Sequence, residues 1–267
     1  MAAPRPRLTI IGGGRMGDAL LGGLLATEWA TAQQLAVSEK LPDLRAALAE
    51  RHPGVAVGPT PVAADGTVLA VKPDDAEVAC RQVADAGAER LLSIVTGVPI
   101  QRLEEWLGGG TAVVRAVPNT PALVGAGATA IAAGRRAGET DLSWAEDVLG
   151  SVGRVVRVPE HLLDAVTGLS GSGPAYVFLL VEALIEAGVL NGLTWDLSRD
   201  LVVQTVLGSA RLLLETGDRP ESLRTAVVSP GGTTAAGLAV LESHAVRGAV
   251  LEAVAAATDR AHRLGLP

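Results

Sequence analysis

Three glycine-rich segments of this 267-residue chain have residue types that suit anion binding. They are Gly-Gly-Gly-Arg-Met-Gly at 12–17, Gly-Ser-Gly-Pro at 171–174 and Ser-Pro-Gly-Gly-Thr-Thr at 229–234. Each stands where a helix is expected to begin. A helix start attracts anions because its first N–H groups are unpaired and the helix dipole is positive there. The first segment suits a cofactor pyrophosphate. The third, with its hydroxyls, predicts a separate anionic group such as a substrate carboxylate.

The first segment has the G-x-G-x-x-G spacing and lies between an expected strand at 8–11 and an expected helix at 18–25. In such a motif the first glycine permits a sharp turn and the second lets the backbone approach the pyrophosphate. The third glycine allows close packing of helix on strand. In this strand–turn–helix context the motif predicts dinucleotide binding. The residues expected to bind the cofactor here are Gly12, Gly14, Arg15, Met16 and Gly17.

The end of the second expected strand bears on which dinucleotide is used, because this position meets the adenosine ribose. Ser38 and Lys40 offer a hydroxyl and a cation that could bind the 2′-phosphate of NADP. Glu39 could instead bind the free ribose diol of NAD, or point to solvent. The sequence therefore allows NADP or NAD, with NADPH favoured of the two and with Ser38 and Lys40 as its expected contacts.

Two further segments end strands at the edge of the sheet where open α/β folds bind ligands. Lys72, in Ala-Val-Lys-Pro at 70–73, could approach the cofactor or simply end its strand in solvent. Asn119, between two prolines, could orient a nicotinamide or substrate, or could be an ordinary turn residue. The cofactor contacts expected from these segments are Ala70, Val71, Lys72, Pro73 and Asn119.

The two later glycine segments differ in how many glycine and hydroxyl residues they have beyond those that a helix cap requires. Pro174 suits a first helical position, and Ser172 or Gly173 suits the cap before it. That segment is therefore as consistent with a cap that allows close packing as with substrate contact. At 229–234, two glycines and two threonines exceed what capping requires, since one Ser or Thr would suffice. This segment is predicted to bind a ligand.

Other familiar catalytic groups are missing from the sequence. There is no G-x-S-x-G segment, and the four histidines lack metal-ligand spacing, so no metal site is predicted. Cys80 is expected to be a small packing residue and not a nucleophile. The reaction is therefore expected to depend on the nicotinamide, with the protein placing an electrophilic carbon against it and satisfying the developing charge.

Composition and charge narrow the class of protein. A net charge of −7 without acidic or basic blocks argues against nucleic acid or an anionic membrane as the main partner. A single cysteine excludes an intrachain disulfide and, with no apolar leader at the start, predicts a cytoplasmic protein. Residues 116–134 are uncharged, but prolines and glycines interrupt them, so a buried loop and strand is expected and not a membrane span.

The pattern of the chain changes near residue 160. Before it, strands are expected at 8–11, 35–38, 55–57, 67–71, 91–95, 112–116, 129–132 and 155–158, and helices at 18–25, 42–51, 75–84, 100–106 and 141–151. After it, only helices are expected, at 161–169, 174–188, 195–216, 221–228, 234–242 and 245–264. Alternation of strands and helices predicts an α/β domain at 1–159 with a mainly parallel, Rossmann-like sheet. An all-helical domain follows at 160–267, and the apolar circumference of its helix 195–216 indicates a subunit interface.

These segments together resemble the pyrroline-5-carboxylate reductases. The resemblance is carried by 12–17, 70–73, 118–121, 164–176 and 228–234, in order over nearly the whole chain. The last two segments are highly specific, whereas many dehydrogenases share the first. The resemblance implies a Rossmann-like domain and a C-terminal helical domain that interlocks with a second subunit, in dimers that often assemble further into decamers.

The resemblance also implies a reaction. Hydride passes from NAD(P)H to the C=N carbon of L-1-pyrroline-5-carboxylate and gives L-proline in the last step of proline biosynthesis. The turn at 229–234 would hold the substrate carboxylate through backbone N–H groups, and Thr234 would hydrogen-bond the ring nitrogen and relay its proton. The implied substrate-binding residues are Ser229, Gly231, Gly232, Thr233 and Thr234, with Thr234 as the catalytic one.

Two departures from the family pattern concern the cofactor. Many relatives have an asparagine shortly after the third strand, where this chain reads Val-Gly-Pro-Thr at 57–60, and Glu39 is less expected in an NADP-preferring member. The sequence also bears on two other functions. A β-hydroxyacid dehydrogenase or imine reductase is disfavoured because the former needs a lysine in its second domain and none follows Lys72. A silent dinucleotide sensor is disfavoured because Thr234 and the glycine pair before it are intact.

Overall fold

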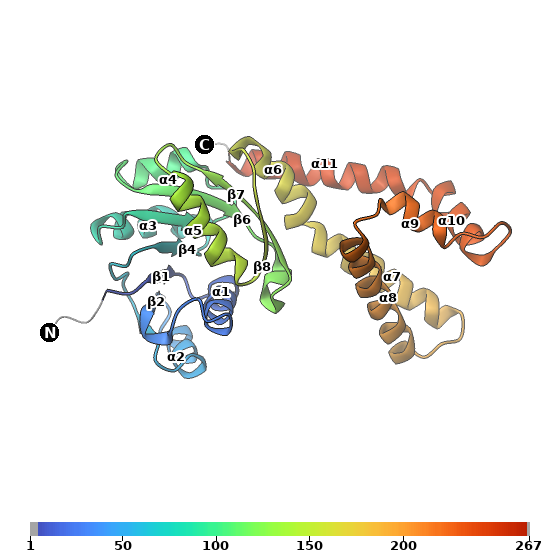
Figure 1. Cartoon of the computed structure of the whole chain (residues 1–267), viewed down its shortest axis with the longest axis horizontal. Helices are drawn as coiled ribbons and strands as arrows, with labels where there is room; N and C mark the ends of the chain where they lie inside the picture. The colour runs from blue at the N-terminus through green and yellow to red at the C-terminus, as the bar shows by residue number, and fades with distance from the viewer. Residues whose placement is uncertain (1–4, 266–267) are drawn as a thin grey trace. The chain divides into compact units, whose positions relative to one another are not determined.

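A computed structural model describes residues 5–265, and its first part alternates strands and helices (Figure 1). The strands are β1 (Leu8–Ile11), β2 (Leu35–Ser38), β3 (Ala56–Gly58), β4 (Thr67–Leu69), β5 (Arg90–Ser93), β6 (Ala112–Val117), β7 (Gly127–Ala133) and β8 (Gly153–Arg157). The α-helices between them are α1 (Arg15–Ala26), α2 (Pro42–Arg51), α3 (Ala76–Asp85), α4 (Ile100–Trp106) and α5 (Glu139–Gly150). Short 3₁₀ turns are η1 (Ala32–Gln34), η2 (Pro73–Asp75) and η3 (Thr120–Val124).

The strands form one eight-stranded sheet in the order β3-β2-β1-β4-β5-β6-β7-β8. Every neighbouring pair is parallel except β6 and β7, which confirms the mainly parallel sheet expected from the sequence. Ile11 is paired with Ser38 on one side and with Leu69 on the other. The carboxyl ends of β1, β2 and β4 therefore lie level, and the loops that follow them share one edge of the sheet.

Aliphatic side chains fill a core on each face of this sheet. One cluster packs α1, α2 and α5 against the sheet, with Leu20, Leu24, Leu48 and Leu149 completely buried. The other cluster packs α3 and α4 against the opposite face. Strands covered on both faces carry continuous apolar runs, and β1 is buried along its whole length. The uncharged residues 116–134 form the end of β6, the turn η3 and then β7, so this stretch is a loop followed by a strand, as expected.

Only helical segments follow β8 in the described part of the chain. They are η4 (Glu160–Leu162), α6 (Leu163–Val166), the π-helical η5 (Thr167–Gly171), α7 (Gly173–Leu190), α8 (Trp195–Thr216), α9 (Pro220–Ala226), α10 (Thr233–Ser243) and α11 (Val246–Gly265). Contacts divide the chain into two compact units. One unit runs as far as Ser172 and resumes at Ala256, and the other is Gly173–Ala255. The first unit extends past residue 160 because Leu163 is completely buried in the core beneath the sheet.

The helix expected to begin at 171–174 does begin there, as α7 at Gly173, but no loop precedes it. Residues 163–171 are already helical, and the Ser172 N–H donates to the carbonyl of Thr167 across a π-helical turn. Since α7 then begins at Gly173, only Ser172 interrupts an otherwise continuous helical path. A helix that continues from its N-terminal side offers no free first turn. This segment therefore lacks the anion-binding geometry that its glycines suggested.

The Gly173–Ala255 unit exposes many large apolar side chains. On α7 and α8 they include Val177, Phe178, Leu179, Leu180, Trp195, Leu201, Val203, Leu207 and Leu214. The helical stretch 160–190 contains an 18-residue window with a mean hydropathy of 1.7, which is long and apolar enough to cross a membrane by length and composition alone. Core helices of soluble proteins pass the same test, so the apolar surface itself does not distinguish a membrane from a protein partner.

Cys80 lies on α3 with no exposed surface, as expected for a packing residue. Burial raises the pKa of its thiol to about 12, because the apolar surroundings disfavour the charged thiolate. The thiolate is the reactive form of cysteine, so Cys80 is not suited to act as a nucleophile in the folded protein.

The native protein is therefore expected to resist thiol reagents. Incubation with 5,5′-dithiobis-(2-nitrobenzoate) at pH 8 should label no thiol in native buffer and one thiol per chain in guanidinium chloride. The Cys80→Ser variant, which should label in neither condition, is the control. Rapid stoichiometric labelling of the native protein would contradict the burial seen here.

Candidate cofactor and substrate sites

The glycine turn after β1 has the geometry that each of its three glycines was expected to provide. Gly12 has a φ of +97°, and a β-carbon there would lie 2.6 Å from the carbonyl oxygen of Ala70. A β-carbon on Gly17 would collide with the carbonyl oxygen of Gly12. A β-carbon on Gly14 would meet no protein atom within 4 Å. The turn is thus tightly packed at Gly12 and Gly17 and open at Gly14, which lies at the start of α1.

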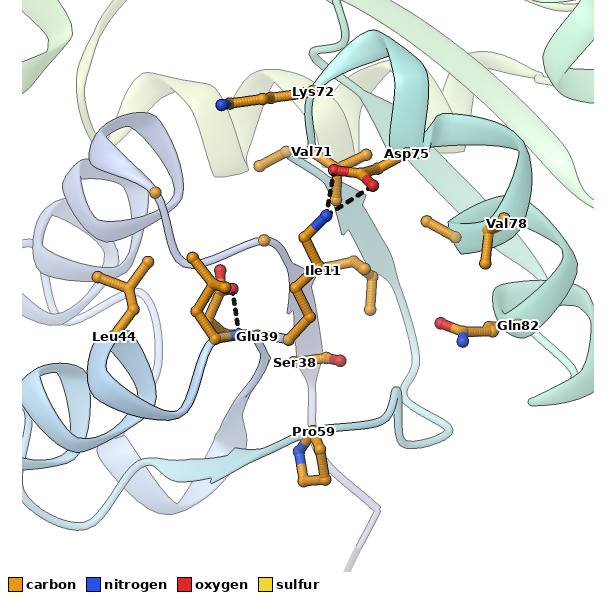
Figure 2. Close-up of a pocket in the computed structure, with 16 residues that line it drawn as sticks. Ile11, Ser38, Glu39, Leu44, Pro59, Val71, Lys72, Asp75, Val78 and Gln82 are labelled. Carbon is orange, nitrogen blue, oxygen red and sulfur yellow. Dashed lines mark hydrogen bonds and ion pairs between the residues drawn. The ribbon is translucent and has the colours of Figure 1, made fainter.

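A cavity of about 350 Å³ lies beside this turn, at the level carboxyl ends of β1, β2 and β4 (Figure 2). Its wall opposite the turn is formed by α3, through Val78, Ala79 and Gln82. The remaining lining comes from the ends of β1 and β2, from the loops after β1, β2, β3 and β4, and from α2 and η2: Ile11, Gly12, Gly14, Ser38, Glu39, Lys40, Leu41, Leu44, Pro59, Ala70, Val71, Lys72 and Asp75. The cavity therefore combines an apolar slot with a few charged groups at its rim.

Glu39 does not point to solvent. Its side chain is buried, with one carboxylate oxygen accepting from the Gly13 N–H and the other from the Leu41 N–H, both at 2.9 Å. The backbone after it is held too, since Nη1 of Arg45 donates to the carbonyls of Glu39 and Lys40 at 2.9 Å. The carboxylate therefore ties the end of β2 to the glycine turn after β1, and it does so inside the cavity.

Lys40 is held by an ion pair with another residue that lines the cavity. Its Nζ lies 2.7 Å from both carboxylate oxygens of Asp75, which comes from the turn η2 before α3 (Figure 2). Both side chains are substantially exposed, so this ion pair contributes at most about 1 kcal/mol to stability. Ser38, also expected at the cofactor, is buried and lines the cavity.

The structure brings together seven of the residues expected at the cofactor, namely Gly12, Gly14, Ser38, Lys40, Ala70, Val71 and Lys72. The others lie outside the lining. Arg15 is exposed on α1, Met16 packs against the core, and Pro73 begins η2. The apolar slot was not predicted, although Pro59 follows the expected strand 55–57 and Val78 lies at the start of the expected helix 75–84 beside the binding edge, so both could have been singled out on that basis.

Asn119 is engaged on both ends of its amide. Its Nδ2 donates to the carbonyl of Ser170 at 3.0 Å, and its Oδ1 accepts from the Ala128 N–H at 2.8 Å. These two bonds join η3 to the start of β7 and to the π-helical segment. The geometry favours the structural interpretation of Asn119, as a residue that fixes the loop after β6.

The turn at 229–234 belongs to the other compact unit and opens α10. Gly231 has a φ of +70°, and Gly232 is the N-cap of the helix without any side chain capping it. A β-carbon on Gly232 would collide with Oγ of Ser229, so the glycine lets this hydroxyl pack against the turn. Thr233 and Thr234 are the first two helical residues, and both are exposed. The helix therefore presents an uncapped first turn beside three hydroxyl groups.

The cavity fits a dinucleotide. Gly14 leaves open space at a helix start where a phosphate can approach backbone N–H groups, and the cavity lies where the strand order reverses, between β1 and β4. The slot between Pro59 and Val78 is apolar and suits a flat ring such as the adenine of the cofactor. Glu39 and Lys40 would then lie near the adenosine ribose and its 2′ substituent.

Comparison with known proteins agrees with this geometry. A family model described as pyrroline-5-carboxylate reductase dimerisation matches residues 160–264, and one described as NADP oxidoreductase, coenzyme F420-dependent, matches residues 7–97. The pyrroline-5-carboxylate reductase of Synechocystis is 44% identical over 97% of this chain and 98% of its own. That of Mycobacterium tuberculosis is 42% identical over 97% of this chain and 96% of its own.

Solved structures give the same result. A pyrroline-5-carboxylate reductase from Coxiella burnetii superposes with a TM-score of 0.92 at 37% identity, over 99% of this chain and 100% of its own. The Plasmodium falciparum enzyme, determined with NADP bound, gives 0.87 at 32% identity over 98% of both chains. With this fold, this cavity and this likeness over its full length, the chain belongs to the pyrroline-5-carboxylate reductase family and is an NAD(P)H-dependent oxidoreductase.

Proposed function

We propose that this protein reduces L-1-pyrroline-5-carboxylate to L-proline, the last step of proline biosynthesis, by transferring hydride from NAD(P)H to the C=N carbon. The observation that supports the proposal is that two separate helix starts have the geometry to hold an anion. One is the glycine turn beside the cavity, and the other is the uncapped first turn of α10. A reductase for a small imino acid needs both, since cofactor and substrate each present an anionic group.

The substrate carboxylate would be held at the start of α10. The first N–H groups of a helix have no intrahelical acceptor, and no side chain caps this helix, so they remain available to an anion. Gly231 and Gly232 shape the turn, and Thr233 contributes the first helical N–H. Ser229 would add its hydroxyl, which the glycine at 232 allows to pack against the turn.

Bound NAD(P)H supplies the hydride. The residue proposed to act on the reacting bond is Thr234, whose hydroxyl would hydrogen-bond the ring nitrogen and hold its proton. The C=N carbon becomes a CH₂ group as it gains hydride, so it acquires no handedness. Stereochemical recognition must then come from the carbon that bears the carboxylate. This explains why the chain would need a specific site for the carboxylate. Because the imine is already protonated, no acid stronger than a hydroxyl is needed.

Replacing Thr234 by alanine is expected to lower kcat/KM for pyrroline-5-carboxylate by about 10²-fold, because the ring nitrogen loses its hydrogen-bond partner. Thr234→Ser should restore most of the activity. Thr225→Ala is the matched control, since Oγ1 of Thr225 makes only a local bond to the carbonyl of Glu221. NADPH and NADH oxidation would be followed at 340 nm. Undiminished turnover by the alanine variant would remove Thr234 from the mechanism.

Gly12→Ala is expected to weaken NAD(P)H binding by about tenfold or more, because a β-carbon would be forced against the Ala70 carbonyl at 2.6 Å. Gly87→Ala is the matched control. Gly87 also has a positive φ, of +71°, but a β-carbon there meets no atom within 4 Å. It should cost about 1–2 kcal/mol of stability and leave cofactor affinity unchanged. Fluorescence titration with NADPH and with NADH measures the cofactor affinity of each variant. Equal losses of affinity in the Gly12→Ala and Gly87→Ala variants would refute the cofactor role of the turn.

The exposed apolar helices are proposed to pair with a second copy of the chain. The dimerisation match covers them, and family membership supports self-association. A dimer, assembling further into a decamer, is proposed, with no membrane and no nucleic acid as partner. Covering these faces by a second copy removes the apolar surface that would otherwise suggest a membrane span. We propose a cytoplasmic location on the same grounds.

In sedimentation-velocity experiments the wild-type protein is expected to have at least twice the mass of one chain. Leu207→Glu, on the exposed face of α8, should shift it toward the monomer, because an ionised carboxylate would be buried without a partner. Val62→Glu introduces the same charge at an exposed apolar residue of the sheet unit and should leave the mass unchanged. A monomeric wild-type protein would refute the assignment.

A further inference from the structure

We infer that Glu39 makes this enzyme prefer NADH to NADPH, acting as the residue that determines cofactor specificity. The inference rests on the cavity beside the glycine turn being the cofactor pocket. It reverses the preference for NADPH that Ser38 and Lys40 suggested in the sequence, because the structure shows what each charged group is doing.

The Glu39 carboxylate is held in place by two backbone N–H groups. Each of its two oxygens accepts one backbone N–H at 2.9 Å, from Gly13 and from Leu41, and the side chain is only 7% exposed. A carboxylate has about four acceptor sites, so about two remain after these bonds. A ribose with free 2′ and 3′ hydroxyls offers two donors for them. The carboxylate is therefore prepared to accept a diol.

A 2′-phosphate would meet this carboxylate as a like charge. The phosphate of NADP brings acceptor oxygens and negative charge to the position of the 2′-hydroxyl, and it replaces a donor that the free acceptor sites of Glu39 need. The Glu39 carboxylate cannot rotate away from the phosphate without a cost. Rotating the carboxylate away would leave the Gly13 and Leu41 N–H groups without their partner, and Gly13 belongs to the turn that holds the pyrophosphate.

In the structure, the cations near the cavity are engaged with other groups or lie apart from Glu39. Lys40 is neutralised by Asp75, which it contacts at 2.7 Å through both carboxylate oxygens. Nη1 of Arg45 donates to the carbonyls of Glu39 and Lys40, and Arg45 does not line the cavity. Lys72 follows β4, and Figure 2 shows its ammonium group well apart from Glu39. At the β2 end of the cavity the charges of Glu39, Asp75 and Lys40 leave an excess of one negative charge.

The exposure of these groups decides which of them matters most. The Lys40–Asp75 pair is largely exposed, and such pairs separate at little cost, so Lys40 could turn toward a phosphate. Glu39 is buried, where charges are screened much less, so its repulsion would persist. The discrimination is therefore assigned to Glu39 and not to the Lys40–Asp75 ion pair.

Isothermal titration of NAD⁺ and NADP⁺ into the full-length protein tests this inference without relying on catalysis. The wild type is expected to bind NAD⁺ at least about tenfold more tightly than NADP⁺. Glu39→Gln should reduce the ratio of the two dissociation constants by about tenfold, because it removes the charge and keeps the size of the side chain. Glu50→Gln is the matched control. It removes one negative charge from an exposed position on α2 and should leave the ratio unchanged.

The ratio separates a specificity role from a merely structural one. If Glu39 only supports the glycine turn, Glu39→Gln will weaken NAD⁺ and NADP⁺ equally and leave the ratio unchanged, which overturns the inference. A wild type that binds NADP⁺ as tightly as NAD⁺ also overturns it, whether or not the variant folds. If neither nucleotide binds, the cofactor pocket itself is wrongly assigned. A protein that binds NAD⁺ but does not reduce pyrroline-5-carboxylate refutes only the proposed reaction.

Discussion

The close approach of the glycine turn to the end of β4 is the constraint on which the cofactor cavity depends. At Gly12 the chain leaves β1 at a positive φ and passes so near the Ala70 carbonyl that a side chain would not fit. Because β1, β2 and β4 end level with one another, the close approach of the turn to Ala70 occurs at the point where the strand order reverses. The loops after these strands then separate, and the space between them is the cavity.

A second constraint comes from the strand beside the turn. The Glu39 carboxylate binds the Gly13 N–H, so the shape of the turn and the charge near the ribose position depend on the same side chain. A buried carboxylate that holds a loop in this way cannot be exchanged for a neutral side chain without affecting both. In the proposed cofactor pocket, pyrophosphate binding and cofactor choice would depend on the same side chain, whose place is set by the register between β1 and β2.

What could be predicted from the sequence was local. The strand β1, the glycine spacing after it and the change to helices near residue 160 follow from patterns within a few turns of chain. The parts that could not be predicted depend on distant partners. Asn119 bonds Ser170, Lys40 pairs with Asp75, and the π-helical turn before Ser172 replaces an expected loop. Glu39 is intermediate, since its position was recognised but its direction required the structure.

The helical unit shows how strongly this protein depends on association. Within Gly173–Ala255 only Ile185 and Ser198 are buried, while large apolar side chains cover α7 and α8. A unit with so small a core cannot offset the conformational entropy of its own folding. This small core agrees with the self-association that the dimerisation match supports, in which a second copy would cover the exposed apolar surface. The turn at 229–234 lies in this unit, which makes the proposed substrate site a property of the assembly and not of the single chain.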